Sequence, residues 1–274
     1  MKKLLLLIVA AIMLMIYADF KYTSISASME KKLIYEENDS SIAEVMPDIK
    51  VMTYNIHRGV NRDNELNLDG IVEAVRNSGA EIIALQEVER YSVRTKFQDQ
   101  IGYIADKLSM QYVFGKSVNI LNGQFGNAIL SKYPIEEYEV RELPSKGEKR
   151  TLLRARLDVY GNKISFYNTH LGLKQSERDK QIEEILKIAG DGNNFILAGD
   201  FNEKVDKLGA ITQKYGDCAS FENNDSKATF VNEGLSERID YIFTSKGFEV
   251  KSYNVPISDA SDHYPVVTTL KFKD

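Results

Sequence analysis

The chain has 274 residues, 43% of them hydrophobic and 27% charged, a globular composition that excludes an intrinsically disordered protein. Its 40 Asp and Glu outnumber its 35 Lys and Arg, and the resulting net charge of -5 disfavours tight non-specific binding to nucleic acid. Because Cys218 is the only cysteine, an intramolecular disulfide is excluded and a cysteine-based zinc site is disfavoured.

Residues 1–28 have the features of a targeting segment. Lys2 and Lys3 precede an unbroken apolar run from Leu4 to Ala18. That run has the length of a signal-peptide core and is shorter than the ~20 apolar residues of a comfortable membrane span. No small-x-small cleavage site lies close behind it, so two alternatives stay open: a cleaved signal peptide, or an N-terminal membrane anchor. Both predict an exported protein, either extracellular or on the outer face of the cytoplasmic membrane.

Two further parts are expected after this segment. Residues 29–48 are polar and acidic without sustained periodicity, which predicts a linker. From residue 49 to residue 274, short runs rich in β-forming residues alternate with a few helical patterns, and no Pro- or Gly-rich boundary interrupts them. Residues 49–274 are therefore predicted to form one domain.

The elements predicted for this domain follow in chain order. Helical spacing of apolar residues predicts helices from Leu68 to Gly79, over residues 101–108, and from Ser176 to Gly190. Apolar and β-branched runs predict strands over residues 50–54, 81–85, 128–130, 152–159, 163–168, 195–198, 228–231, 239–243, 248–255 and 266–272. This mixture predicts an α/β domain in which sheets pack face to face and helices cover the outside.

Polar side chains follow four of the apolar strands, at the point where each strand ends. The four endings are Asn55-Ile56-His57, Gln86-Glu87, Asn168-Thr169-His170 and Asp200-Phe201-Asn202, and two later clusters hold Asp240 and Asp262-His263. Each cluster alone is weak, because a lone Glu or an Asp-x-Asn is usually loop or turn chemistry. Together they are more informative, since all three histidines of the chain fall inside them and strand ends on one rim of a sheet converge.

These residue types suit metal-assisted hydrolysis of a phosphate ester. Catalysis on a phosphodiester has to neutralise charge, activate water and stabilise the leaving oxygen. Carboxylate and amide oxygens, such as those of Glu87 and Asn55, are ligands that Mg²⁺ prefers with phosphate substrates. Zinc is a distant second, because neither paired cysteines nor an HExxH motif is present. The sequence also lacks the P-loop motif and the GxSxG elbow, which excludes P-loop phosphoryl transfer and the usual serine hydrolase.

Seven motifs resemble, in the same order, those of the endonuclease/exonuclease/phosphatase superfamily. They are TYNIH (53–57), LQEV (85–88), GNAILSKYPI (126–135), NTHL (168–171), GDFN (199–202), RIDYIF (238–243) and SDHYPV (261–266). GDFN and SDH with an upstream QE form a specific combination, and the short spacing looks most like the small bacterial metal-dependent hydrolase branch. The resemblance implies a four-layered α/β sandwich, with two packed mixed β-sheets flanked by helices, and a catalytic domain over residues 49–274.

The resemblance also implies a metal site at the matching positions. Glu87 would be the principal ligand of Mg²⁺, with Asn55 beside it, and Mn²⁺ is a possible substitute. Asp262 would help to hold the metal or would orient His263. Whether one or two metal ions act stays open.

Catalytic roles follow from the same resemblance. Asp200 and Asn202 would position the attacking water and the phosphate, and Asp240 would support His263 or the metal shell. His263 would contact the scissile phosphate, and His170 would act as an acid or phosphate ligand, as in the deoxyribonuclease and neutral sphingomyelinase branches. The water could lose its proton to Asp200 or to His263, because a neutral histidine is a good base near pH 7 and a carboxylate could rely on metal-lowered water acidity.

Four more residues are candidate substrate contacts. His57 and Arg58 follow the first motif and could touch substrate phosphate, although a solvated loop pair is an equal alternative. Asn127 lies in the GNAILSKYPI motif. Arg154 could also bind phosphate, against the alternative of a surface position on a strand.

Three functions compete for this site. The first is an exported phosphodiesterase acting on a lipid headgroup or another small diester, the second is an extracellular nuclease, and the third is an inactive binding module of the same fold. Export favours the first, and the N-terminal apolar segment could associate with a membrane. The absence of Trp and of an obvious exposed aromatic hairpin argues against insertion into a bilayer. Monoester hydrolysis would need a basic cluster, for which Lys146, Lys149 and Arg150 are the candidates. We expect a monomer that forms no stable complex with nucleic acid.

Overall fold

The computed structural model describes residues 46–120, 122–190, 192, 194–232 and 234–273. The predicted targeting segment (1–28) and residues 29–45 of the predicted linker lie outside this described part. Among the described residues, no helix is both long enough and apolar enough to cross a membrane.

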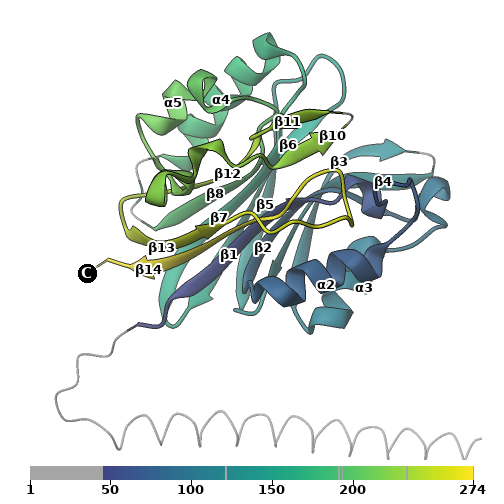
Figure 1. Cartoon of the computed structure of the whole chain (residues 1–274), viewed down its shortest axis with the longest axis horizontal. Coiled ribbons are helices and arrows are strands. Elements are labelled where there is room, and N and C mark those ends of the chain that lie inside the picture. The colour runs from purple at the N-terminus through teal and green to yellow at the C-terminus, as the bar shows by residue number, and fades with distance from the viewer. Residues whose placement is uncertain (1–45, 121, 191, 193, 233, 274) are drawn as a thin grey trace, which may run out of the picture. The chain divides into compact units, whose positions relative to one another are not determined.

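Two six-stranded mixed sheets form the centre of the domain (Figure 1). The first has the order β13-β14-β1-β2-β4-β3, with β1 and β2 parallel and the other neighbours antiparallel. Its strands are β1 (Ile49–Asn55), β2 (Ile82–Arg90), β3 (Gln111–Ile120), β4 (Gly123–Ser131), β13 (Phe248–Asn254) and β14 (Val266–Phe272).

The second sheet has the order β5-β6-β7-β8-β12-β9, and β7 and β8 are its parallel pair. Its strands are β5 (Ile135–Leu143), β6 (Arg150–Val159), β7 (Asn162–His170), β8 (Phe195–Asp200), β9 (Gly216–Asp217) and β12 (Asp240–Thr244). A separate two-stranded hairpin joins β10 (Phe230–Asn232) to β11 (Leu235–Glu237).

Helices cover the outer face of each sheet. Figure 1 shows α2 (Leu68–Ser78) and α3 (Gln100–Leu108) on one side, and α4 (Gln175–Ala189) and α5 (Gly209–Thr212) on the other. Short 3-10 turns span His57–Gly59, Val93–Thr95, Val205–Lys207 and Cys218–Ser226. Helix α2 begins where Asn67 Oδ1 accepts the backbone N–H of Gly70 at 2.9 Å, and it ends at Gly79 in the left-handed conformation that favours glycine.

The period-two alternation of the strands divides the apolar residues into three layers. Val51 and Ile196 point into the central layer between the two sheets. Met52 points outward to α2 and α3, and Leu197 points outward to α4 and α5. The order helix, sheet, sheet, helix confirms the predicted four-layered α/β sandwich.

The central layer becomes polar at one end, and this change positions the site. On β1 the inward positions Val51 and Thr53 are followed by Asn55, and on β8 Ile196 and Ala198 are followed by Asp200, all of them buried. Burying a polar group without a partner is costly, so each of these groups is expected to be hydrogen-bonded.

The sequence did not predict strands β3 and β5, and their positions explain why. Both lie at an edge of their sheet, and only one position of β5 is buried. A strand that is mostly exposed does not need regular alternation of apolar residues, so its sequence carries a weak strand signal.

Candidate active site

The ends of β1, β2 and β8 meet at Asn55. Its side-chain amide donates hydrogen bonds to Glu87 Oε1 at 3.2 Å and to Asp200 Oδ2 at 2.9 Å. Its Oδ1 accepts the backbone N–H of His57 at 3.0 Å, and its backbone carbonyl accepts Ser261 Oγ at 2.8 Å. Asn55 therefore ties four of the predicted polar clusters together and holds two carboxylates close to each other.

A β-bulge in β2 turns Glu87 toward the same place. Gln86 and Glu87 together lie opposite the single residue Asn127 of β4. Regular alternation would put Glu87 on the outer face with Leu85, but the bulge and a left-handed backbone (φ 58°) at Glu87 bring its side chain to Asn55. A non-glycine residue in this conformation is uncommon and costs free energy, as is found at functional positions.

A buried amide network supports these groups from below. Gln86 Nε2 donates to Thr53 Oγ1 at 3.0 Å and to Asn168 Oδ1 at 2.7 Å. Asn168 Nδ2 donates to the backbone carbonyls of Leu85 at 2.8 Å and Ala128 at 2.7 Å. Because Asn168 comes from the second sheet and the others from the first, this network fixes the two sheets against each other directly beneath the site.

His263 is held by a buried carboxylate. Its Nδ1 lies 2.8 Å from Asp240 Oδ2, which also accepts Thr229 Oγ1 at 2.7 Å. The other ring nitrogen, Nε2, lies 3.7 Å from Asp200 Oδ2. Burial opposes protonation of the ring, but the carboxylates of Asp240, Asp200 and Asp262 outweigh it and raise the pKa of His263 to about 10.

Asp200 is the carboxylate around which the histidines gather. Burial and the neighbouring charge of Asp240 raise the pKa of Asp200 to about 7. His263, the Asn55 amide and the backbone N–H of Asn202 act in the opposite direction, the last by a hydrogen bond of 2.8 Å to Oδ1. This carboxyl group can therefore gain or lose a proton near neutral pH.

His170 approaches Asp200 from the end of β7. Its Nε2 lies 3.6 Å from Asp200 Oδ2. Burial, with smaller contributions from the positive charges of Arg150 and His263, holds the pKa of His170 well below its usual value. Arg150 is itself buried and pairs with Glu148 at 3.0 Å. The two deeply placed histidines thus have opposite pKa shifts.

These side chains line a cleft of about 550 Å³. The predicted residues that face it are His57, Arg58, Glu87, His170, Asp200, Asn202, Asp262 and His263. Asn55 and Asp240 lie behind them, in contact with Asp200 and His263 respectively. His57 Nδ1 lies 3.6 Å from Asp262 Oδ1, and Arg58 Nη2 lies 2.8 Å from His57 Nε2, so this pair belongs to the cleft wall.

Two predicted substrate contacts do not line the cleft. Asn127 is buried, and its amide donates to the backbone carbonyl of Thr151 at 3.2 Å. Arg154 pairs with Glu137 at 2.8 Å on the neighbouring strand β5. The structure therefore places Asn127 as a link between the two sheets and Arg154 in a surface ion pair.

The cleft also contains residues that the sequence did not single out. Arg94 lies in the short 3-10 turn Val93–Thr95, which carries no motif, and Phe230 packs its ring 4.9 Å from that of His263. Thr229, which holds Asp240, precedes Phe230 in a stretch of weak periodicity. Arg150 was only one of three possible basic residues. No local pattern marks these positions, because their place in the cleft depends on how distant segments pack.

Comparison with known proteins assigns the chain to a family. The model of the Endonuclease/Exonuclease/phosphatase family matches residues 52–263, which is well over half of the chain. The chain belongs to this family. A relative, the uncharacterized protein YbhP of Escherichia coli K12, is 34% identical over 178 residues, which are 58% of this chain and 70% of YbhP.

Solved structures of the family have the same fold. An endonuclease/exonuclease/phosphatase from Beutenbergia cavernae has a TM-score of 0.74 at 23% identity, covering 82% of this chain and 72% of the other. A mannosyl-6-phosphatase from Bacteroides thetaiotaomicron has a TM-score of 0.64 at 21% identity, covering 82% of this chain and all (100%) of the other. Members of this family are hydrolases, phosphatases and nucleases among them.

Two sets of donors in the site could hold a metal ion. Atoms of Asp200, Asp240 and His263 lie within 4.8 Å of one another. However, His263 Nδ1 and Asp240 Oδ2 are already hydrogen-bonded to each other at 2.8 Å, so an ion at this set would have to use the other donor atoms of the two residues. In the predicted set, Glu87 and Asp262 offer carboxylate oxygens on the cleft side and Glu87 is turned there by the bulge, whereas Asn55 lies behind them and its Oδ1 accepts the backbone N–H of His57.

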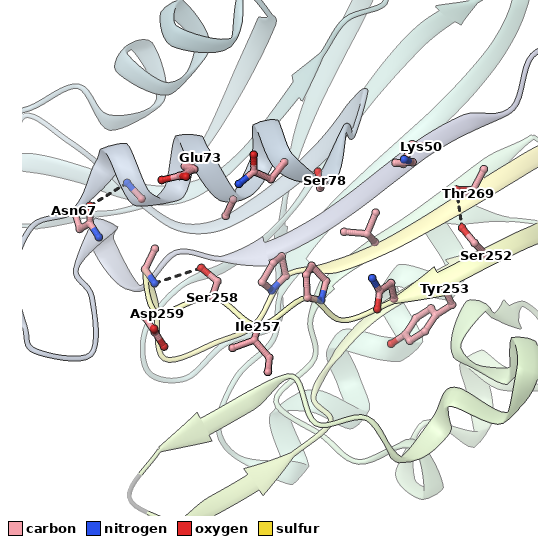
Figure 2. Close-up of a pocket in the computed structure, with 18 residues that line it drawn as sticks. Lys50, Asn67, Glu73, Ser78, Ser252, Tyr253, Ile257, Ser258, Asp259 and Thr269 are labelled. Carbon is pink, nitrogen blue, oxygen red and sulfur yellow. Dashed lines mark hydrogen bonds between the residues drawn. The ribbon is translucent and has the colours of Figure 1, made fainter.

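A larger groove of about 720 Å³ lies elsewhere on the first sheet (Figure 2). It runs between α2, which contributes Glu73 and is capped by Asn67, and the loop that holds Ile257, Ser258 and Asp259. Neither histidine nor arginine lines it, and none of the predicted site residues does. The cleft, although smaller, is therefore the candidate active site.

Proposed function

We propose that the protein is a Mg²⁺-dependent phosphoesterase that cleaves phosphodiester bonds by in-line attack of water. The observation that carries this proposal is the buried pair of His263 and Asp240, with Asp200 3.7 Å from the second ring nitrogen of His263. A buried imidazole that is hydrogen-bonded to one carboxylate and faces another can take part in proton transfer, and in its cationic form it can stabilise negative charge on a phosphate.

The positively charged side chains of the cleft would bind the phosphate group of the substrate. Arg58, Arg94 and Arg150 line it, and the contact with Asp240 favours the charged form of His263. Guanidinium groups are suited to phosphate because they offer several N–H donors in one plane. A bound phosphodiester would therefore lie with its non-bridging oxygens toward these donors.

Asp200 and the histidines would divide the proton transfers. Water attacks phosphorus opposite the leaving oxygen, the phosphorus–oxygen ester bond breaks, and its electron pair stays on the leaving oxygen. Asp200 accepts the proton of the water, because His263 is held in its cationic form by Asp240 and has no free lone pair. Cationic His263 donates a hydrogen bond to the phosphate, neutral His170 donates another, and the leaving oxygen takes its proton from solvent.

Glu87, Asn55 and Asp262 would hold the divalent cation. When bound, Mg²⁺ or Mn²⁺ would supply positive charge to the phosphate oxygens and lower the pKa of a bound water. The oxygen donors and the bulge at Glu87 support this assignment.

Phosphomonoester hydrolysis is a second candidate. It is favoured by the three cleft arginines, because a monoester carries more negative charge than a diester. The structural similarity to a mannosyl-6-phosphatase agrees with this alternative, although it concerns the fold alone.

Export is also part of the proposal. It is supported by the apolar run from Leu4 to Ala18 behind Lys2 and Lys3. A protein acting outside the cytoplasm would meet lipid headgroups and released diesters as substrates.

A substrate panel tests the function. The purified full chain is assayed with Mg²⁺ or EDTA on bis-p-nitrophenyl phosphate, p-nitrophenyl phosphate, sphingomyelin, phosphatidylinositol and plasmid DNA. We expect hydrolysis of the diesters with Mg²⁺ and none with EDTA. A faster reaction on p-nitrophenyl phosphate would favour the monoesterase, preferential cleavage of DNA would favour the nuclease, and inactivity on every substrate would favour a binding module.

A further inference from the structure

Large apolar side chains are exposed around the mouth of the cleft. Val93 is 50% exposed, Phe97 61%, Leu173 76% and Leu235 59%. Single exposed apolar residues are common on protein surfaces, so exposure alone indicates nothing. The position of these four, on three separate segments that all contribute to the cleft, is what distinguishes them.

Each segment is tied to the cleft by a lining residue. Val93 and Phe97 lie on the loop that contributes Arg94, and Leu173 lines the cleft itself. Leu235 lies on the β10–β11 hairpin, two residues before the lining residue Glu237 and therefore on the same face of the strand. We refer to Val93, Phe97, Leu173 and Leu235 as the apolar rim.

The loop of residues 92–97, which carries Val93 and Phe97, packs closely against the neighbouring β3–β4 hairpin. A Cβ atom at Gly123, the first residue of β4, would come within 2.4 Å of the backbone nitrogen of Ser92. The loop also closes on itself, because the backbone N–H of Phe97 donates to the carbonyl of Ser92 at 2.8 Å. Phe97 has a left-handed backbone (φ 58°), so the loop turns sharply where this ring is exposed.

Basic residues lie next to three of the four rim residues along the chain. Lys96 precedes Phe97 and Lys174 follows Leu173, and both lysines are exposed. Arg94 follows Val93, and its guanidinium pairs with the buried carboxylate of Glu89. Apolar side chains beside Lys or Arg are typical of surfaces that enter the headgroup region of a bilayer, where the chains bury and the cations meet phosphate.

We propose that the apolar rim docks on a lipid bilayer surface, with the cleft opening onto phosphodiester headgroups. This inference rests on the proposed function and specifies its substrate as a lipid presented at an interface. A rim around the mouth suits a bilayer, because a fluid surface supplies headgroups to the cleft while the rim is buried. Phe97 and the aliphatic rim residues provide the apolar contacts for which the sequence, without Trp, showed no candidate.

The absence of Trp permits a direct test, because any introduced indole is the only one in the chain. Phe97→Trp and Leu173→Trp place it on the rim. Tyr160→Trp is the matched control: Tyr160 is 51% exposed, has a left-handed backbone (φ 52°) like Phe97, and lies in the β6–β7 turn at the opposite end of β7 from His170. The full chain of each variant is mixed with vesicles of brominated phosphatidylcholine and phosphatidylglycerol in equal amounts.

We expect the rim indoles to shift their emission to the blue and to be quenched about twofold or more by the bromines, since interfacial groups enter roughly 5–10 Å into the headgroup and acyl boundary. The control indole should show neither change, whether or not residues 4–18 hold the chain at the membrane. Equal emission shifts and equal quenching for all three indoles would overturn the proposal. Rim indoles that show no emission shift and no quenching would also overturn it, and would favour a protein partner for the rim. Hydrolysis of soluble bis-p-nitrophenyl phosphate by the unmodified chain tests the proposed function separately.

Discussion

Replacing Asp240 by Asn removes one negative charge while preserving the shape of the side chain. In the native protein Asp240 Oδ2 lies 2.8 Å from His263 Nδ1, and Asp240 is the first of the carboxylates that raise the pKa of His263. The substitution should therefore lower this pKa, which allows the charge of the pair to be measured through folding stability. It should also reduce turnover about 10²–10⁴-fold, the range of losing a positioned acid–base group.

The magnitude follows from the pKa of His263. A pKa raised from 6.5 to about 10 in the folded state favours the protonated folded protein by roughly 5 kcal/mol. Because the folded pKa is the higher one, this contribution is complete below the unfolded pKa and is lost as the pH rises through the folded pKa. Between pH ~6.5 and ~9.5 the metal-free protein should lose about 3–4 kcal/mol of unfolding free energy from this group.

Urea denaturation in EDTA at the two pH values measures this loss. Asp240→Asn should reduce the contribution of His263 to the pH-dependent loss of unfolding free energy to less than about half. Some of this contribution should remain, because Asp200 and Asp262 still raise the pKa of His263. Asp259→Asn, the same change at an exposed residue of the other groove, should leave the native pH dependence in place. An equal loss of stability in native protein and Asp240→Asn would refute the reasoning, because the pair would then carry no such charge.

Three further substitutions test other contacts. Glu87→Gln should raise the Mg²⁺ concentration for half-maximal rate at least about tenfold, with the exposed Glu142→Gln as the unaffected control; an unchanged Mg²⁺ titration would remove Glu87 as a ligand. Arg150→Ala should raise the KM for p-nitrophenyl phosphate about 10–100-fold in steady-state assays, on the scale of one charge-assisted hydrogen bond, and an unaltered KM would place substrate elsewhere. Arg238→Ala should lower the free energy of unfolding, measured by urea denaturation, by about 3–5 kcal/mol. The Arg238 guanidinium lies 2.8 Å from the buried carboxylate of Asp217, which the substitution deprives of that partner; a loss below ~1 kcal/mol would contradict this.

Much of the fold could be predicted because the inner strands are buried on both faces. Their apolar runs are nearly continuous, so β1, β7 and β8 were predicted close to their observed limits, whereas β2 continues to Arg90, five residues beyond its predicted end. The polar residue that follows each run marks the end of the central layer, and for this reason the residues around Asn55, His170 and Asp200 could be expected to meet. The edge strands β3 and β5 lack such a signal, since solvent accepts almost any side chain there.

The rest of the site depends on packing that no local pattern encodes. The bulge that turns Glu87 inward depends on how β2 pairs with β4, and the position of Arg94 depends on the contact of its loop with Gly123. Conversely, Arg154 was a reasonable phosphate ligand by residue type, but strand alternation directs it toward Glu137. Residue type indicates which chemistry is possible, whereas tertiary contacts decide which side chains take part.

The central claim is that the cleft around His263 hydrolyses phosphate esters. Its most direct test is the Mg²⁺-dependent initial rate of bis-p-nitrophenyl phosphate hydrolysis by the full chain and by His263→Ala. Asn254→Ala on β13, expressed and purified in the same way, is the control variant. We predict a rate that EDTA abolishes and that His263→Ala reduces by about 10²-fold or more, while Asn254→Ala retains the native rate. Equal rates for His263→Ala and the native protein would contradict the account.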